Sequence, residues 1–250
     1  MRNIIISGAT RGLGKALARG LSHPNTKLFL IARGKLEETK KAAEAKGAQA
    51  KTYNIDLADT LKLEETIEKI FSHIDKDSIE SFYLINNAAV LEPVGPSWKN
   101  NTKLVKYHFL VNTVAPLVLS NLFIKHLKDF PLDKRIINIS SGAALRPIYG
   151  WSSYCCSKTA LDMITSCISL EQEREKYPVK IISLNPGVMD TGMQEQIRKV
   201  EKEDFPDKDC YVRLLEEGKL PNPEWIADKI VKLLESDDFP NGRVLTINDI

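Results

Sequence analysis

The chain alternates short aliphatic runs with longer stretches of helical periodicity. The aliphatic runs are almost continuous, as in Ile4-Ile5-Ile6, and end in glycine, proline or polar residues. The longer stretches repeat apolar residues three and four positions apart, a spacing typical of amphipathic helices. We expect strands at 3–7, 27–31, 50–54, 82–86, 135–139, 179–184 and 243–247, and helices near 13–22, 35–46, 59–74, 101–128, 152–176 and 223–235.

Buried strands that alternate with helices predict a particular α/β fold. It is a doubly wound, Rossmann-type parallel sheet of about seven strands with helices on both faces. We expect residues 1–250 to form a single domain, since no repeat or linker interrupts the pattern. Residues 189–222 depart from it with mixed charges, glycines and prolines. Because this segment follows the carboxyl end of a strand, we expect a substrate lid, with an ordinary surface excursion as the alternative.

Composition narrows the class of protein. The chain is 43% hydrophobic and 27% charged with a net charge of +2, so its charge gives no argument for a nucleic-acid or membrane-surface partner. We expect no apolar run long enough to cross a bilayer. The chain runs from Met1 straight into a strand, which predicts no signal peptide and a cytoplasmic location. The 4 cysteines and 4 histidines follow no metal-ligand spacing, so we expect no metal.

A glycine-rich turn follows the first strand. Residues 7–14 read SGATRGLG. Gly8, Gly12 and Gly14 allow a tight turn and let backbone amides reach a pyrophosphate at the start of the next helix. The position between a strand and a helix makes the motif specific for a dinucleotide.

The end of the second strand indicates which dinucleotide. Sites that prefer NAD carry an acidic residue about 20 residues beyond the turn, where it binds the ribose 2′-hydroxyl. Here Ala32 occupies that place, Arg33 follows it, and Arg11 lies within the glycine turn. Two guanidinium groups without an acid suit a 2′-phosphate, which predicts NADP(H).

Tyr154 and Lys158 lie four residues apart, one turn along the same face of a predicted helix. A nearby ammonium group favours the phenolate, so we expect the pKa of Tyr154 to fall from about 10 towards neutrality. Tyr154 is then a candidate proton donor to a carbonyl oxygen that receives a hydride. Ser141, at the end of an apolar run, is placed to hydrogen-bond the same oxygen as its charge grows.

Three asparagine-containing segments complete the pattern: Asn86-Asn87-Ala88-Ala89, Asn112 and Asn185-Pro186-Gly187. Together with the glycine turn and the Ser-Tyr-Lys set, they resemble the short-chain dehydrogenase/reductase family over essentially the whole chain. The resemblance implies an oxidoreductase with a catalytic tetrad of Ser141, Tyr154, Lys158 and Asn112. Asn112 would hold a water of a proton relay; the alternative is a buried asparagine that kinks its helix.

The same resemblance implies the cofactor contacts. Lys158 would also bind the nicotinamide ribose, and Asp56 would touch the adenine unless it merely caps a helix, as Asp59 also could. Asn87 and Ala88 would line the adenine ribose. The cofactor residues are expected to be Gly8, Arg11, Gly12, Leu13, Gly14, Arg33, Asp56, Leu57, Asn87, Ala88, Tyr154, Lys158, Pro186, Gly187, Val188 and Thr191.

Several stretches resemble the branch of the family that holds sepiapterin reductases and bacterial benzil reductases. This implies an NADPH-dependent reduction of one carbonyl of a vicinal diketone such as benzil to the (S)-hydroxyketone. Alternatives are a sepiapterin reductase, a catalytically weak NADP-binding sensor and an NAD-dependent sugar or steroid dehydrogenase. Sepiapterin reductases anchor the pterin through an aspartate near the C-terminus, where this chain has Thr246, with Asp249 nearby.

The substrate pocket is expected to be apolar and aromatic. Its walls would come from two regions, one after Ser141 and one at the start of the lid; core or dimer contacts are the alternative for each residue. By resemblance, a homodimer would form through the helices near 101–128 and 152–176. The expected substrate residues are Ser141, Leu145, Tyr149, Trp151, Tyr154, Met189 and Met193.

Overall fold

The computed structural model describes residues 1–74 and 78–250. Its centre is a 7-stranded sheet in the order β3-β2-β1-β4-β5-β6-β7, and every neighbouring pair is parallel. The predicted Rossmann-type sheet is confirmed. The strands are β1 (Arg2–Ser7), β2 (Thr26–Ala32), β3 (Gln49–Asn54), β4 (Ser81–Asn86), β5 (Asp133–Ile139), β6 (Lys180–Asn185) and β7 (Val244–Thr246).

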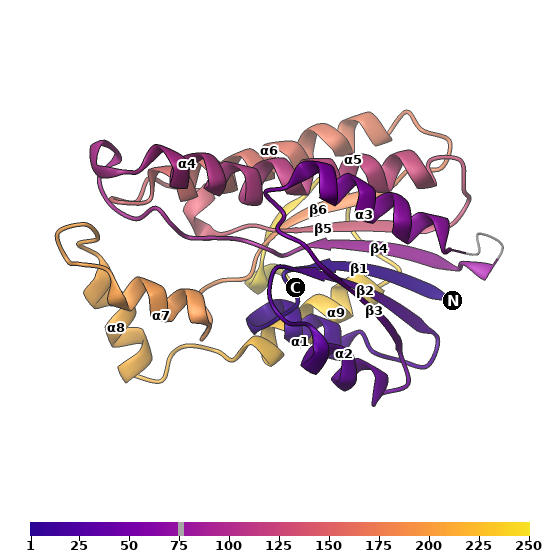
Figure 1. Cartoon of the computed structure of the whole chain (residues 1–250), viewed down its shortest axis with the longest axis horizontal. Coiled ribbons are helices and arrows are strands. Elements are labelled where there is room, and N and C mark those ends of the chain that lie inside the picture. The colour runs from indigo at the N-terminus through magenta and orange to yellow at the C-terminus, as the bar shows by residue number, and fades with distance from the viewer. Residues whose placement is uncertain (75–77) are drawn as a thin grey trace.

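Helices cover both faces of the sheet, and two more lie beyond its carboxyl edge (Figure 1). One layer holds α3, α5 and α6, and the other holds α1, α2 and α9. The helices are α1 (Gly12–Gly20), α2 (Glu37–Glu44), α3 (Thr60–Ser72), α4 (Thr102–Phe109), α5 (Ala115–Leu127), α6 (Ser152–Gln172), α7 (Gly192–Lys199), α8 (Lys208–Glu216) and α9 (Pro223–Glu235).

Two hydrophobic cores, one on each face, explain why the central strands are apolar throughout. Ile4 and Ile6 pack towards α1 and α9, whereas Ile5 packs towards α3 and α5. All three side chains are fully buried. A strand between two helical layers therefore needs apolar residues at consecutive positions, not at alternate ones.

The second core is centred on an aromatic group. Phe82 of β4 lies 5.2 Å from Phe71 and 5.3 Å from Phe123, measured between ring centroids, and Phe29 stacks at 6.3 Å. Each ring comes from a different element, so Phe82 joins β2, β4, α3 and α5.

The predicted helix over 101–128 is interrupted by a wider turn. A π-helical segment, Leu110–Val114, joins α4 to α5. By length and composition alone, the combined stretch Thr102–Leu127 could cross a membrane, since an 18-residue window within it has a mean hydropathy of 1.4. The expectation that no segment reaches this length was therefore wrong. The apolar residues of α5 pack in the second core, as in the core helix of a globular fold.

The segment 189–222 packs over the carboxyl edge of the sheet through α7 and α8. Phe205, between these helices, is fully buried and stacks on Trp151, with centroids 4.8 Å apart and planes 7° apart. Lys99 forms an ion pair of 2.8 Å with Asp204. Gly150 faces the Asp204 carbonyl so closely that a Cβ atom there would lie 2.3 Å from it, and its own carbonyl accepts a 2.8 Å hydrogen bond from Gly95. These contacts define a three-part clamp formed by residues 95–99, 150–151 and 204–205.

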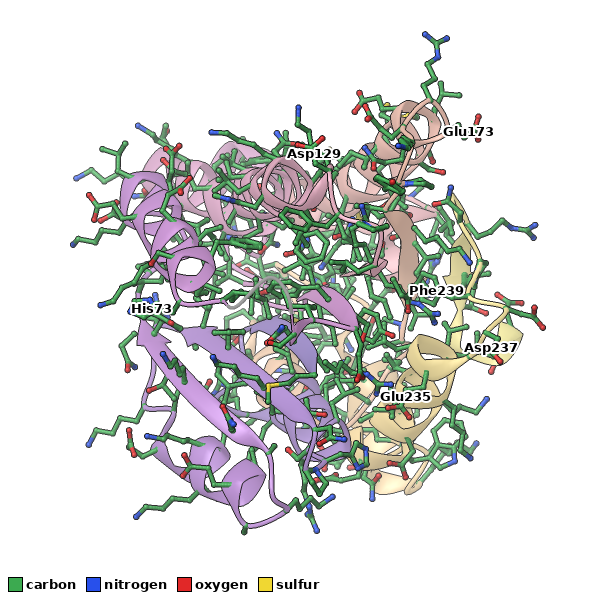
Figure 2. All side chains as sticks on the ribbon, turned by 90° about the vertical axis from the view of Figure 1, so that its right-hand side faces the viewer. His73, Asp129, Glu173, Glu235, Asp237 and Phe239 are labelled. Atoms are coloured by element: carbon green, nitrogen blue, oxygen red, sulfur yellow. The ribbon has the colours of Figure 1, made fainter. Side chains whose placement is uncertain are left out.

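The opposite end of the molecule, seen in Figure 2, carries the helix ends at His73, Asp129, Glu173 and Glu235. Phe239 packs at this end against Arg135, whose guanidinium lies 5.1 Å from the ring centroid. Side chains such as Phe239 and Arg135 pack together at this end, whereas the carboxyl ends of the strands border a cavity.

Replacing Phe82 by alanine should lower the free energy of unfolding by about 3–5 kcal/mol, because a buried ring is removed from the aromatic group. Urea denaturation followed by circular dichroism measures this change. Leu61→Ala, at a position 73% exposed, is the control and should change stability by about 0.5 kcal/mol or less. Equal effects of the two substitutions would contradict the role given to Phe82.

Candidate active site

A cavity of about 720 Å³ opens at the carboxyl ends of the central strands. The strand order reverses between β1 and β4, and ligands of doubly wound sheets bind at such a switch point. Every residue predicted to contact the cofactor lines this one cavity. These are Gly8, Arg11, Gly12, Leu13, Gly14, Arg33, Asp56, Leu57, Asn87, Ala88, Tyr154, Lys158, Pro186, Gly187, Val188 and Thr191.

The glycine turn has the shape of a phosphate cradle. Gly8 and Gly12 have φ values of +72° and +54°, a backbone region that favours glycine. A Cβ atom on Gly14 would lie 2.3 Å from the Gly8 carbonyl oxygen, so no larger residue fits. Arg11 occupies the N-cap position of α1 with an extended backbone, and its side chain makes no hydrogen bond to the first amides of the helix. The free N–H groups at this helix start suit a pyrophosphate.

Asn87 fixes the turn against the neighbouring strand. Its Nδ2 donates hydrogen bonds to the carbonyls of Ser7 (3.0 Å) and Gly8 (3.2 Å). In return, the Ser7 hydroxyl accepts hydrogen bonds from the N–H groups of Asn87 (3.0 Å) and Ala88 (3.1 Å). The first and fourth strands are thus joined at the point where the cavity begins.

The end of the cavity where the sequence predicts the adenine carries a polar group of three side chains. Arg33 donates to the Tyr107 hydroxyl at 2.7 Å, and that hydroxyl donates to the two Asp56 oxygens at 3.1 and 3.0 Å. Asp59, not Asp56, caps α3 by accepting from the Lys62 N–H. The alternative that Asp56 caps this helix is therefore excluded.

Ser141, Tyr154 and Lys158 line the other end of the cavity together. Tyr154 lies on α6 and Ser141 directly after β5, and a hydrogen bond from Ser141 lowers the pKa of the phenol. Burial outweighs this bond and raises the pKa of Tyr154 to about 12. The predicted fall towards neutrality is therefore wrong for this state of the protein, because the phenol is removed from water.

Lys158 lies over the ring of Tyr154 and is itself buried. Its Nζ lies 5.7 Å from the Tyr154 ring centroid and donates at 2.8 Å to the Ile139 carbonyl. Burial lowers the pKa of Lys158 to about 8, while Asp162 acts in the opposite direction. The Lys158 amine is therefore mostly protonated at neutral pH. Its positive charge lies beside the ring of Tyr154.

Asn112 lies in the π-helical turn and is buried. Its Oδ1 accepts from the Val90 N–H, and its Nδ2 donates to the Val90 carbonyl, both at 2.8 Å. The Nδ2 also lies 2.9 Å from Nε2 of His108. None of the described lining of the cavity comes from Asn112, so its water-binding role stays a prediction. The helix widens at this residue, in line with the alternative that the sequence left open.

The predicted substrate residues divide into two groups. Trp151, Met189 and Met193 line the cavity, and the Tyr154 hydroxyl contacts the Met193 sulfur at 3.8 Å. Leu145 and Tyr149 do not line it; they are 69% and 57% exposed. They follow the short turn after Ser141, which directs them to solvent. The prediction that Leu145 and Tyr149 line the substrate pocket is therefore wrong, because both side chains lie on the surface.

The sequence analysis missed several lining residues. Tyr211 reaches the cavity from α8, and nothing in its local sequence distinguishes it from the other residues of 189–222. Tyr107 lies on α4, five residues before Asn112, and only the packing of that helix shows its role. No three His, Cys, Asp or Glu side chains gather to hold a metal among the described residues. The other missed residues include Ile148, Gln194 and Ile197.

Comparison with known proteins agrees with this geometry. The chain is 41% identical over 249 residues to a benzil reductase ((S)-benzoin forming) of Bacillus cereus, with 100% of both chains covered. A sepiapterin reductase of Bos taurus is 29% identical and covers 98% of this chain and 94% of its own. The crystal structure of the KRED1-Pglu enzyme has a TM-score of 0.82 at 27% identity, covering 98% of this chain and 100% of that one. The sequence pattern of the family described as short chain dehydrogenase matches residues 2–202. The chain therefore belongs to the short-chain dehydrogenase/reductase family of oxidoreductases.

Proposed function

We propose that the protein is an NADPH-dependent carbonyl reductase that converts an aromatic vicinal diketone such as benzil to its (S)-hydroxyketone. The observation that supports the proposal is a cluster of aromatic and thioether side chains in the cavity wall beside Tyr154: Trp151, Met193 and Tyr211. The one acid in the described lining, Asp56, belongs to the adenine end. The name of the Bacillus cereus relative, benzil reductase ((S)-benzoin forming), supports the same substrate class.

The glycine cradle and the adenine end support the choice of cofactor. Ala32 leaves no acid for a ribose 2′-hydroxyl, and the Arg33 side chain is 69% exposed towards the place where a 2′-phosphate would lie. Arg11 adds a second guanidinium at the same cavity. A reduced nicotinamide nucleotide bound here would supply the hydride that the reduction needs.

The side chains at the other end supply the proton. With a pKa of about 12, Tyr154 keeps its proton at neutral pH and is ready as a general acid. Ser141 would hydrogen-bond the carbonyl oxygen as negative charge develops there. When Tyr154 donates its proton to that oxygen, the Lys158 ammonium would stabilise the phenolate that remains.

The tail argues against a pterin substrate. Asp249 accepts hydrogen bonds from the Thr246 N–H (2.7 Å) and hydroxyl (2.9 Å) in a local cap. Neither residue lines the cavity that the structure describes. A pterin ring would therefore find no tail carboxylate to pair with its nitrogens, and unpaired polar groups weaken binding.

Four sequence-based expectations stay predictions. They are the single domain over residues 1–250, the cytoplasmic location, the homodimer and the opening of residues 189–222 as a lid. A catalytically weak sensor stays the second candidate function, although Ser141, Tyr154 and Lys158 lie together as a reductase requires.

The direct test compares benzil, 1-phenyl-1,2-propanedione and sepiapterin, with NADPH and with NADH, by the loss of the near-ultraviolet absorbance of the reduced cofactor. We expect efficient turnover of both diketones with NADPH and little turnover of sepiapterin, because the pocket lacks a pterin anchor. Faster reduction of sepiapterin would contradict the substrate assignment. Binding of NADPH without any turnover would favour the sensor.

Replacing Tyr154 by phenylalanine should lower kcat for diketone reduction by at least about 100-fold, because the general acid is removed. The dissociation constant of NADPH should change little, which fluorescence titration measures. Tyr177→Phe, at the far end of the sheet, is the matched control. Retention of most of the turnover by Tyr154→Phe would contradict the proposed role.

The rate of reduction should depend on pH through Lys158. Because the pKa of Lys158 is about 8, its amine is fully protonated well below that pH and becomes neutral above it. We expect kcat/KM to be constant below neutrality and to fall by about tenfold per pH unit well above pH 8. Lys158→Met should be slower and lack this descending limb. A wild-type profile that stays flat up to about pH 10 would show that the charge of Lys158 is not needed.

A further inference from the structure

Tyr107 lies between the two charged residues at the adenine end of the cavity. It comes from α4, whereas Arg33 follows β2 and Asp56 follows β3. All three line the cavity. The ring of Tyr107 also lies under the Arg33 guanidinium, at 5.9 Å from its centroid. One side chain thus touches both the guanidinium and the carboxylate.

The hydrogen bonds have a defined direction. Asp56 can only accept, so the phenol hydrogen goes to its carboxylate, at 3.1 and 3.0 Å. The phenol oxygen is then free to accept from Arg33, at 2.7 Å. Burial and the bond to Asp56 raise the pKa of Tyr107, so the hydroxyl keeps its hydrogen at neutral pH.

In this arrangement the phenol lies between the two charged groups, which form an ion pair without a direct hydrogen bond. The Arg33 Nη1 lies 3.7 Å from the nearest Asp56 oxygen, beyond hydrogen-bond distance, and 2.7 Å from the neutral phenol. Asp56 accepts hydrogen bonds from the phenol and from the Ala58 N–H, and its ion pair with Arg33 includes no direct hydrogen bond. The guanidinium therefore retains N–H donors for another anion.

It also restricts a mobile side chain. The Arg33 side chain is 69% exposed and extends from a strand end, so by itself it would sample many rotamers. Fixing an arginine costs side-chain entropy, and a hydrogen bond combined with a ring contact reduces that cost before a ligand arrives.

We propose that Tyr107 is a positioning residue that holds Arg33 ready for the 2′-phosphate of NADPH and thereby sets the preference for NADPH over NADH. This inference rests on the proposed function, since it assumes that Arg33 receives that phosphate. The 2′-phosphate is the one chemical group that distinguishes the two cofactors, so the effect of Tyr107 must be confined to NADPH.

The test measures the dissociation constants of NADPH and NADH by fluorescence titration for the full chain. Tyr107→Phe keeps the ring and removes the hydroxyl, so NADPH binding should weaken about five- to tenfold while NADH binding changes less than about twofold. Tyr53→Phe is the matched control, because the described residues offer its hydroxyl no hydrogen bond. It should leave both constants unchanged.

Arg33→Ala, alone and combined with Tyr107→Phe, shows whether Tyr107 acts through Arg33. If it does, Tyr107→Phe should cause no further loss of NADPH binding once Arg33 is absent. An undiminished loss in that background would overturn the proposal, as would equal losses for NADPH and NADH, which would place the effect on Asp56 and the adenine.

The NADPH and NADH affinities of the wild-type protein distinguish a failure of this inference from a failure of the proposed cofactor preference. A wild-type protein without preference for NADPH would overturn both. A clear wild-type preference that Tyr107→Phe leaves intact would overturn only the role of Tyr107.

Discussion

The close contact between the first and fourth strands at the glycine turn is the constraint on which the rest of the site depends. Gly14 leaves no room for a Cβ atom beside the Gly8 carbonyl, and Asn87 binds that carbonyl from the neighbouring strand. A parallel sheet brings its carboxyl ends to one edge, and this contact keeps the edge from being filled by side chains. The glycine turn, the group of Arg33, Tyr107 and Asp56, and the predicted catalytic residues all surround the space that results.

Within that space, burial decides the chemistry more than charge does. The sequence suggests that Lys158 makes Tyr154 acidic, but burial raises the pKa of Tyr154 and lowers that of Lys158. The pair is therefore a protonated phenol beside a lysine ammonium that loses its proton more readily than a lysine in water does. A protonated phenol can act as a general acid towards a carbonyl oxygen that becomes basic.

Local patterns predicted the strands well, and the residues they assign to the cofactor all line one cavity, because both features depend on short segments. An uninterrupted apolar run predicts a buried parallel strand, and glycine spacing predicts the turn whatever surrounds it. Leu145 and Tyr149 were placed wrongly because their neighbours in sequence line the pocket, while the direction of a side chain after a turn depends on tertiary packing. Tyr107 and Tyr211 were missed for the same reason. Their contacts join elements that lie far apart in the chain.

The clamp between residues 95–99, 150–151 and 204–205 has a consequence for protein engineering. The segment over the pocket is not a separable module, because Phe205 rests on Trp151 and the Asp204 carbonyl fills the place of a side chain at Gly150. A chimera that takes this segment from a relative with another substrate would have to import the two facing loops with it. The packing of this segment therefore depends on three parts of the chain that lie far apart in sequence, and recombination at a single crossover would separate them.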